Sequence, residues 1–113
     1  MRLLCTVFLL LFASSSFASS AAPALPSFLS YKSNGIVLVY VNSARSGTVP
    51  TCATLQSGTY FPFAINATTN AGRVLLAGLL AARASGQMIW VFGSGLCDVQ
   101  SDVESIDRFN YAD

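Results

Sequence analysis

The sequence predicts a mainly β domain with one helix and five strands, in the order β-β-β-α-β-β. Three observations lead to this prediction. Residues 36–41 are nearly all β-branched or aromatic, which is typical of a strand buried on both faces. Residues 71–85 are rich in Ala, Leu and Arg, which favour a helix. Apolar positions then recur in residues 87–92 and 104–111, and we expect each of these segments to form a strand.

The first 18 residues are typical of a secretory signal peptide. Arg2 precedes an apolar run at residues 3–12, and a Ser- and Ala-rich stretch follows it. The run is too short for a membrane-spanning helix, which needs roughly twenty apolar residues. Ser16 and Ala18 satisfy the small-x-small rule for cleavage after Ala18, although cleavage up to residue 22 and an uncleaved anchor are alternatives. The sequence therefore predicts a secreted or periplasmic protein.

Residues 19–33 are expected to form an irregular arm, because Pro23, Pro26 and several serines interrupt them. A turn at residues 32–35 then leads into the first strand at residues 36–41. After a loop at residues 42–50, we expect a second strand at residues 51–55 and a third at residues 60–65. Pro62 has no backbone donor, so it should lie at an edge or a bulge.

The helix is expected to begin after a cap at Thr69 or Asn70 and to end at Gly86. At 100° per residue, its leucines share one broad stripe, formed by Leu75, Leu76, Leu79 and Leu80. The opposite side lacks the polar face that a surface helix of a monomer should have. It is formed by one charged residue and four small ones: Arg73, Ala77, Gly78, Ala81 and Ala84. We expect this face to contact another subunit, and an Ala-rich face exposed to water is the alternative.

The strand at residues 87–92 is apolar on both sides, which predicts a central position in the sheet. Trp90 is expected in the core, with stacking on a ligand as the alternative. Residues 93–95 form a tight turn that presents Cys97. Residues 104–111 are expected to close the domain as a strand. A helix over residues 101–108 is the alternative, since Ser101 and Glu104 resemble a capping box.

This order of elements is the connectivity of an OB-fold, a partly open five-stranded barrel. The sequence therefore predicts one OB-fold-like domain over residues 34–113, preceded by the arm and the signal peptide. A small α+β sandwich, with the helix over an open sheet, is the alternative.

Two cysteines, Cys52 and Cys97, follow the predicted cleavage point. An even count in an exported protein predicts one disulfide, and free thiols are the alternative. Their spacing fits no metal site. Without Arg2, five Lys and Arg residues stand against five Asp and Glu residues, so the net charge gives a nucleic-acid partner no electrostatic support.

The chemistry of an enzyme is missing from the sequence. It contains no His, and Glu104 is the only Glu. The acidic residues all follow Cys97, with no second group in a different environment to separate their pKa values. Lys32 is the only Lys and lies in the arm. We therefore expect neither catalysis nor a cofactor.

The run LLAARASGQMIWVFGSGLC at residues 79–97 resembles a group of small exported bacterial proteins. Residues 69–73 (TNAGR) and 102–106 (DVESI) resemble the same group. These proteins are similar to the B subunit of subtilase cytotoxin and to related AB5 toxin B subunits. The resemblance implies an OB-fold that forms a ring with its helices facing a central pore, and that recognises glycans at its surface.

Together these observations predict an exported binding module that associates with copies of itself and binds a cell-surface glycan. A heterologous toxin subunit is a further candidate partner. The candidate residues for stacking on a sugar are four aromatic side chains: Tyr40, Tyr60, Phe61 and Trp90. The alternative is a small structural or inhibitory exported protein that acts through protein–protein contact alone.

Overall fold

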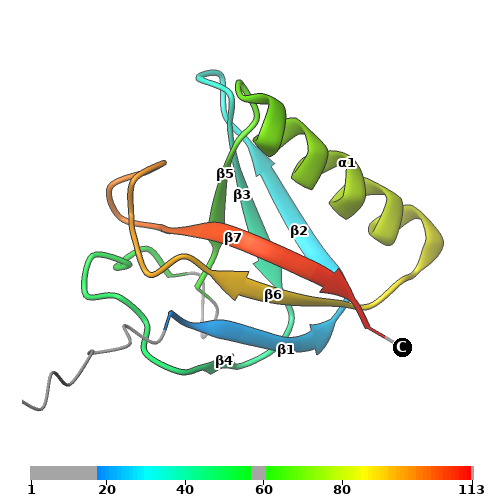
Figure 1. Ribbon diagram of the computed structural model, residues 1–113, viewed down its shortest axis with the longest axis horizontal. Coiled ribbons are helices and arrows are strands. Elements are labelled where there is room, and N and C mark those ends of the chain that lie inside the picture. Colours follow the sequence, from blue (N-terminus) through cyan, green and yellow to red (C-terminus); the bar gives the residue numbers. More distant parts are fainter. Residues whose placement is uncertain (1–17, 57–60, 113) are drawn as a thin grey trace, which may run out of the picture.

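The computed structural model describes residues 18–56 and 61–112. The strands form one curled sheet, a half-barrel in the order β2-β3-β5-β7-β6-β1-β4, and the helix α1 lies against it (Figure 1). The elements are β1 (Ser20–Ala24), β2 (Pro26–Tyr31), β3 (Ile36–Val41), β4 (Arg45–Ser46), β5 (Phe63–Asn66), α1 (Asn70–Ser85), β6 (Ile89–Gly93) and β7 (Glu104–Tyr111). The mainly β fold with one helix is confirmed, whereas the order of five strands is not, since seven strands are present in the described residues.

The segment that we expected to be an irregular arm forms β1 and β2, so that prediction is wrong. β1 pairs antiparallel with β6, and β2 pairs antiparallel with β3. Pro23 lies where the β1–β6 register shifts, between Ala21 and Ala24, and Pro26 is the first residue of β2. Proline is tolerated at both kinds of position because no ladder donor is needed there. The two prolines therefore bend the chain without excluding strands.

The expected second strand at residues 51–55 is also absent. Its backbone forms local turns instead, with Ala53 N donating to Pro50 O at 3.0 Å and Thr54 N donating to Cys52 O at 3.0 Å. β5 begins three residues later than expected for the third strand, immediately after Pro62. β5 pairs antiparallel with β3 and parallel with the start of β7.

The remaining elements follow the expectations closely. Thr69 caps α1 by accepting a hydrogen bond from Gly72 N at 3.0 Å. Gly86 ends the helix with a φ of 69°, a left-handed conformation that favours glycine. β6 is central, between β7 and β1, and β7 spans the predicted closing strand, so the alternative helix over residues 101–108 is wrong.

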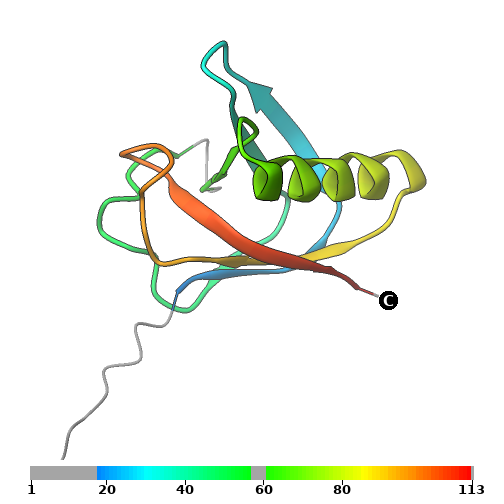
Figure 2. The ribbon, with the colours of Figure 1, turned by 45° about the horizontal axis from the view of Figure 1, so that its top comes forward.

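Two hydrophobic clusters lie on opposite faces of the sheet. The inner cluster fills the space between α1 and the concave side of the sheet, where the helix contacts β2, β5 and β7 (Figure 2). Leu79 and Ala82 of α1 are completely buried in it. The outer cluster consists of Leu38, Ala64 and Val103, and the loop residues Leu55 and Val99 pack against it.

Candidate functional site

The outer face of β6 carries an exposed aromatic side chain. Ile89 and Val91 are fully buried in the inner cluster. Because successive side chains of a strand alternate between its faces, Trp90 and Phe92 lie on the outer face. Trp90 is 44% exposed, and its ring stacks on that of Phe92 with the centroids 5.1 Å apart. The expectation that Trp90 belongs to the core is therefore wrong.

The neighbouring strand β7 places polar groups beside these rings. Arg108 lies opposite Phe92, and Asn110 lies opposite Trp90. The guanidinium carbon of Arg108 is 4.3 Å from the Phe92 ring centroid, within the range of a favourable cation–π contact. Asp107 pairs with Arg108 at 3.1 Å in an ion pair that is more than half exposed. We call Trp90, Phe92, Arg108 and Asn110 the aromatic platform.

The aromatic platform combines a flat apolar surface with hydrogen-bonding groups. The Asn110 amide can donate and accept, and the Arg108 guanidinium can donate. The ion pair with Asp107 leaves the platform close to electrical neutrality. On the other side of β6, the small residue Ser20 lies opposite Phe92, and the next residue with a side chain on that face, Ala22, is exposed and small. Small side chains therefore flank the aromatic rings on the β1 side, and Trp90 is the exposed ring of the two.

The structure does not bring the four predicted ligand-binding aromatics together. Tyr40 is half-buried on β3, which is not a neighbour of β6 in the sheet. Phe61 is half-buried, and its carbonyl oxygen accepts a hydrogen bond from Arg45 Nη2 at 2.8 Å. Tyr60 lies outside the described residues. Of the four predicted residues, Trp90 belongs to the aromatic platform. The sequence analysis did not predict the other members, Phe92, Arg108 and Asn110.

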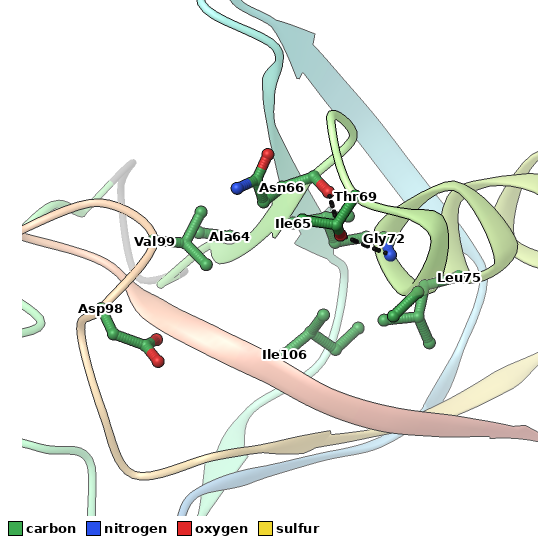
Figure 3. Close-up of a pocket in the computed structure, with 10 residues that line it drawn as sticks. Ala64, Ile65, Asn66, Thr69, Gly72, Leu75, Asp98, Val99 and Ile106 are labelled. Atoms are coloured by element: carbon green, nitrogen blue, oxygen red, sulfur yellow. Dashed lines mark hydrogen bonds between the residues drawn. The ribbon is translucent and has the colours of Figure 1, made fainter.

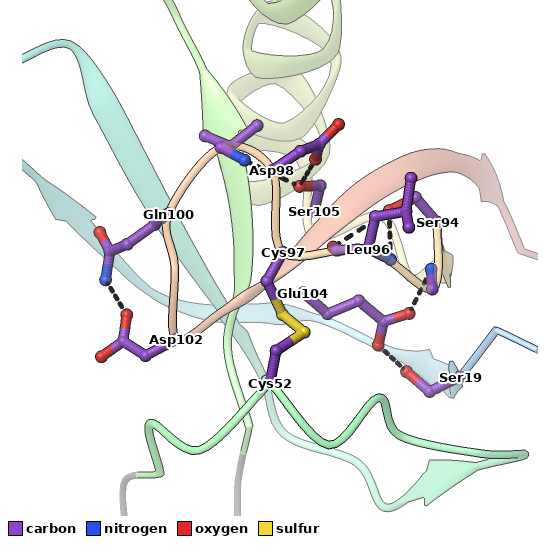
Figure 4. The surroundings of a disulfide bond; sticks show 12 residues. Ser19, Cys52, Ser94, Leu96, Cys97, Asp98, Gln100, Asp102, Glu104 and Ser105 are labelled. Carbon is purple, nitrogen blue, oxygen red and sulfur yellow. Dashed lines mark hydrogen bonds between the residues drawn. A yellow bond between two sulfur atoms is a disulfide. The ribbon is translucent and has the colours of Figure 1, made fainter.

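A second polar cluster, formed by Arg45, Glu104 and Ser19, is buried. Arg45 Nη1 and Glu104 Oε1 form an ion pair at 2.9 Å, with side-chain exposures of 8% and 0%. Glu104 Oε1 also accepts a hydrogen bond from the Ser19 hydroxyl, and its Oε2 accepts one from Gly95 N at 2.9 Å (Figure 4). The Arg45 guanidinium lies over the Phe63 ring, 3.5 Å from its centroid. Burial lowers the pKa of the Arg45 guanidinium, and the charge of Glu104 opposes this effect.

This buried cluster has the features of a structural link. It connects β4 with β7, and Arg45 Nη2 also donates to Pro62 O at 2.9 Å, just before β5. Among the described residues, no buried side-chain nitrogen or oxygen lacks a hydrogen-bond partner. The polar groups of the cluster therefore form hydrogen bonds with one another or with the backbone. None of them needs a ligand as its hydrogen-bond partner.

The predicted disulfide is present between Cys52 and Cys97, with the Cα atoms 6.2 Å apart. It joins the loop at residues 50–56 to the loop between β6 and β7 (Figure 4). Close to the disulfide, Leu55 N donates to Asp102 O at 3.1 Å, which links the same two loops. The disulfide therefore fastens the loops that cover the outer cluster.

A cavity of about 370 Å³ opens where β5 diverges from β7 beside the first turn of α1 (Figure 3). It is lined by Ala64, Ile65, Asn66, Thr69, Ala71, Gly72, Leu75, Asp98, Val99 and Ile106. Asp98 supplies the carboxylate of this lining, and it accepts a hydrogen bond from the Ser105 hydroxyl. The lining contains no second ionisable side chain with which Asp98 could exchange a proton.

The face of α1 that we expected to contact another subunit is largely open in the single chain. Ala77, Ala81 and Ala84 are exposed, as is Arg73, which donates to Ala67 O at 3.3 Å. Gly78 does not belong to this face, because a Cβ atom there would lie 2.7 Å from Phe109 Cζ on β7. Two larger apolar side chains extend the open face: Val74 and Leu80, which are 72% and 42% exposed.

Within residues 18–56 and 61–112, no helix has the length and apolar character that crossing a membrane requires. The same residues contain no group of three or more His, Cys, Asp or Glu side chains that could hold a metal ion. The chain matches no protein-family model, no curated protein and no solved structure.

Proposed function

We propose that this protein is an exported binding module that holds a sugar ring of a surface glycan against Trp90. The observation that carries the proposal is the exposure of Trp90 on a sheet face, where its ring already stacks on Phe92. A large aromatic side chain left in water forfeits the free energy that its burial would supply. Ligand binding recovers that free energy.

The groups beside Trp90 favour a sugar over other flat ligands. One face of a pyranose ring presents C–H groups that pack on an indole ring, while its hydroxyl groups need hydrogen-bond partners at the edge. Asn110 and Arg108 provide such partners on the same face of the sheet. A nucleobase would also stack, but a nucleic acid would need positive charge for its phosphates, and Asp107 offsets Arg108.

The test is glycan-array binding by the purified protein, followed by titration of the best ligand with Trp90→Ala. We expect Trp90→Ala to weaken binding by roughly 30-fold or more, which is typical for a Trp side chain that becomes buried when its partner binds. Phe28→Ala is the matched control, because Phe28 is 57% exposed on β2, outside the platform. Equal losses in the two variants, or an array without any bound sugar, would contradict the proposal.

We also propose that copies of the chain associate through the open face of α1. The exposed side chains of Val74 and Leu80, next to the small residues Ala77 and Ala81, support this proposal. The same surface supports the alternative function, in which a small structural or inhibitory protein acts by contact with another protein and binds no sugar. A heterologous toxin subunit stays a candidate partner on the basis of the resemblance alone.

The OB-like barrel is likewise a proposal, and the sheet order supports it. Leu25 alone separates β1 from β2, so residues 20–31 can be counted as one bent strand that pairs with β6 at one end and β3 at the other. Leaving out the two-residue β4, residues 18–56 and 61–112 then contain five strands with α1 after the third, and the third and fifth run parallel. We also propose that the protein is secreted into an oxidising compartment. The disulfide between Cys52 and Cys97 supports this proposal, because disulfides persist in such compartments.

A further inference from the structure

Ser19 is part of the folded domain, although it directly follows the segment that resembles a signal peptide. It is 1% exposed. Its hydroxyl donates to Glu104 Oε1 and accepts a hydrogen bond from Arg45 Nη1. Its carbonyl oxygen accepts a hydrogen bond from Gly93 N at 2.8 Å. Residue 19 therefore completes the buried cluster and also extends the pairing with β6.

The residues after Ser19 are equally fixed. Ser20 pairs with Phe92 and Ala21 pairs with Val91 in the β1–β6 register. Ala21 is completely buried in the inner cluster. Cleavage after residue 21 or 22 would remove these pairs together with both bonds of the Ser19 hydroxyl. Of the cleavage points that the sequence allows, only the one after Ala18 leaves all of these contacts in the mature chain.

Ala18 itself is packed between two turns. A Cβ atom on Gly47 would lie 2.9 Å from the Ala18 carbonyl oxygen, and a Cβ atom on Gly95 would lie 3.7 Å from Ala18 Cβ. A peptidase has to bind the segment around the bond in its own cleft and to polarise this carbonyl group. Neither is feasible while Ser19 is paired with β6 and the carbonyl group of Ala18 faces Gly47. The bond between Ala18 and Ser19 is therefore accessible before the domain folds and protected afterwards.

We propose that a signal peptidase hydrolyses the Ala18–Ser19 bond before the domain folds, so that Ser19 is the first residue of the working protein. Water adds across the amide bond: Ala18 retains a carboxylate on the released leader, and Ser19 gains an ammonium group. This ammonium is attached to the Cα atom whose side chain contacts Glu104, so the new charge lies beside the buried carboxylate. This inference does not depend on the sugar ligand.

The cleavage point is tested by expressing the full chain in an exporting host and determining the intact mass and N-terminal sequence of the exported, disulfide-bonded protein. We expect one species that begins at Ser19. A folded species that begins at Ala22 or Pro23, or that retains residues 1–18, would overturn the proposal.

The order of events is tested with the full chain and a purified signal peptidase in detergent. The peptidase is added before and after oxidative folding, which is followed by the loss of free thiols. We expect release of the leader from the reduced, unfolded chain and at least a tenfold slower release from the folded one. Equal rates would refute the order that we propose. The variant Ala18→Leu, which breaks the small-residue rule, should release no leader in either state, and release from it would place the cleavage elsewhere.

Discussion

Glu104 is completely buried, and the guanidinium group of Arg45 balances its charge at 2.9 Å. Replacing one member of such a pair leaves the other charge buried without its counterion, which typically costs about 3–5 kcal/mol. We therefore expect Glu104→Gln to lower the free energy of unfolding by an amount in that range. Urea denaturation followed by tryptophan fluorescence measures it.

Asp107→Asn is the matched control for Glu104→Gln, since it breaks the exposed ion pair with Arg108. Exposed pairs contribute about 0–1 kcal/mol, so the control should remain close to the unmodified protein. The double variant Arg45→Met with Glu104→Gln should recover part of the loss, because it removes both charges. Similar losses in Glu104→Gln and Asp107→Asn would show that Glu104 is not held as the structure describes.

Individual residues were the hardest to place from the sequence. Glu104 was recognised as the only Glu, but its partner Arg45 is 59 residues earlier in the chain, and no local pattern joins the two. For Trp90, the strand is apolar at both alternating sets of positions, so periodicity alone could not decide which set faces the inner cluster. The spacing of Trp90 and Phe92, two residues apart, did contain the information that they share a face.

Elements with strong local signals were predicted well. Residues 36–41 and 104–111 form strands with the expected bounds. The helix α1 has its cap at Thr69, one of the two residues expected for it, and ends at Gly86 as expected. β1 and β2 were missed because their stability comes from pairing with β6 and β3, which lie elsewhere in the sequence. Their prolines dominated the local pattern, whereas bulge and first-strand positions accommodate them.

The open face of α1 leads to a prediction about assembly. Ala81 is exposed on this face, so Ala81→Glu should leave the folded chain intact while placing a carboxylate in the proposed contact. A buried charge without a partner is costly. We expect the unmodified protein to form an oligomer and Ala81→Glu to form a monomer, as measured by size-exclusion chromatography with light scattering.

Ala44→Glu provides the control for this assembly test. It introduces the same side chain at an exposed loop position outside α1, and it should leave the mass of the oligomer unchanged. A monomeric unmodified protein would end the proposal of self-association through α1. An oligomer that survives Ala81→Glu would place the contact on another surface.

At the scale of the whole molecule, the outer cluster is small and relies on loops for its cover. Leu38 and Ala64 come from the sheet, while Leu55 and Val99 come from the two loops that the disulfide joins. The sequence predicted the disulfide from the even number of cysteines, but it could not show what the bond secures. The loop at residues 50–56 forms no strand. The bond between Cys52 and Cys97 is therefore the cross-link that holds this loop against the loop between β6 and β7.

Removing this restraint should destabilise the protein as a whole. The cysteines are 45 residues apart, and the loop-closure entropy for that separation corresponds to about 4 kcal/mol. For a domain of this size, we expect the double variant Cys52→Ser with Cys97→Ser to lower the Tm by roughly 15 °C or more. Hydrogen exchange should become faster first at residues 50–56, while amides of β6 remain protected by β1 and β7. A reductant should lower the Tm of the unmodified protein and leave that of the double variant unchanged. Equal Tm values for the oxidised protein and the double variant would mean that the loops hold the outer cluster without the disulfide.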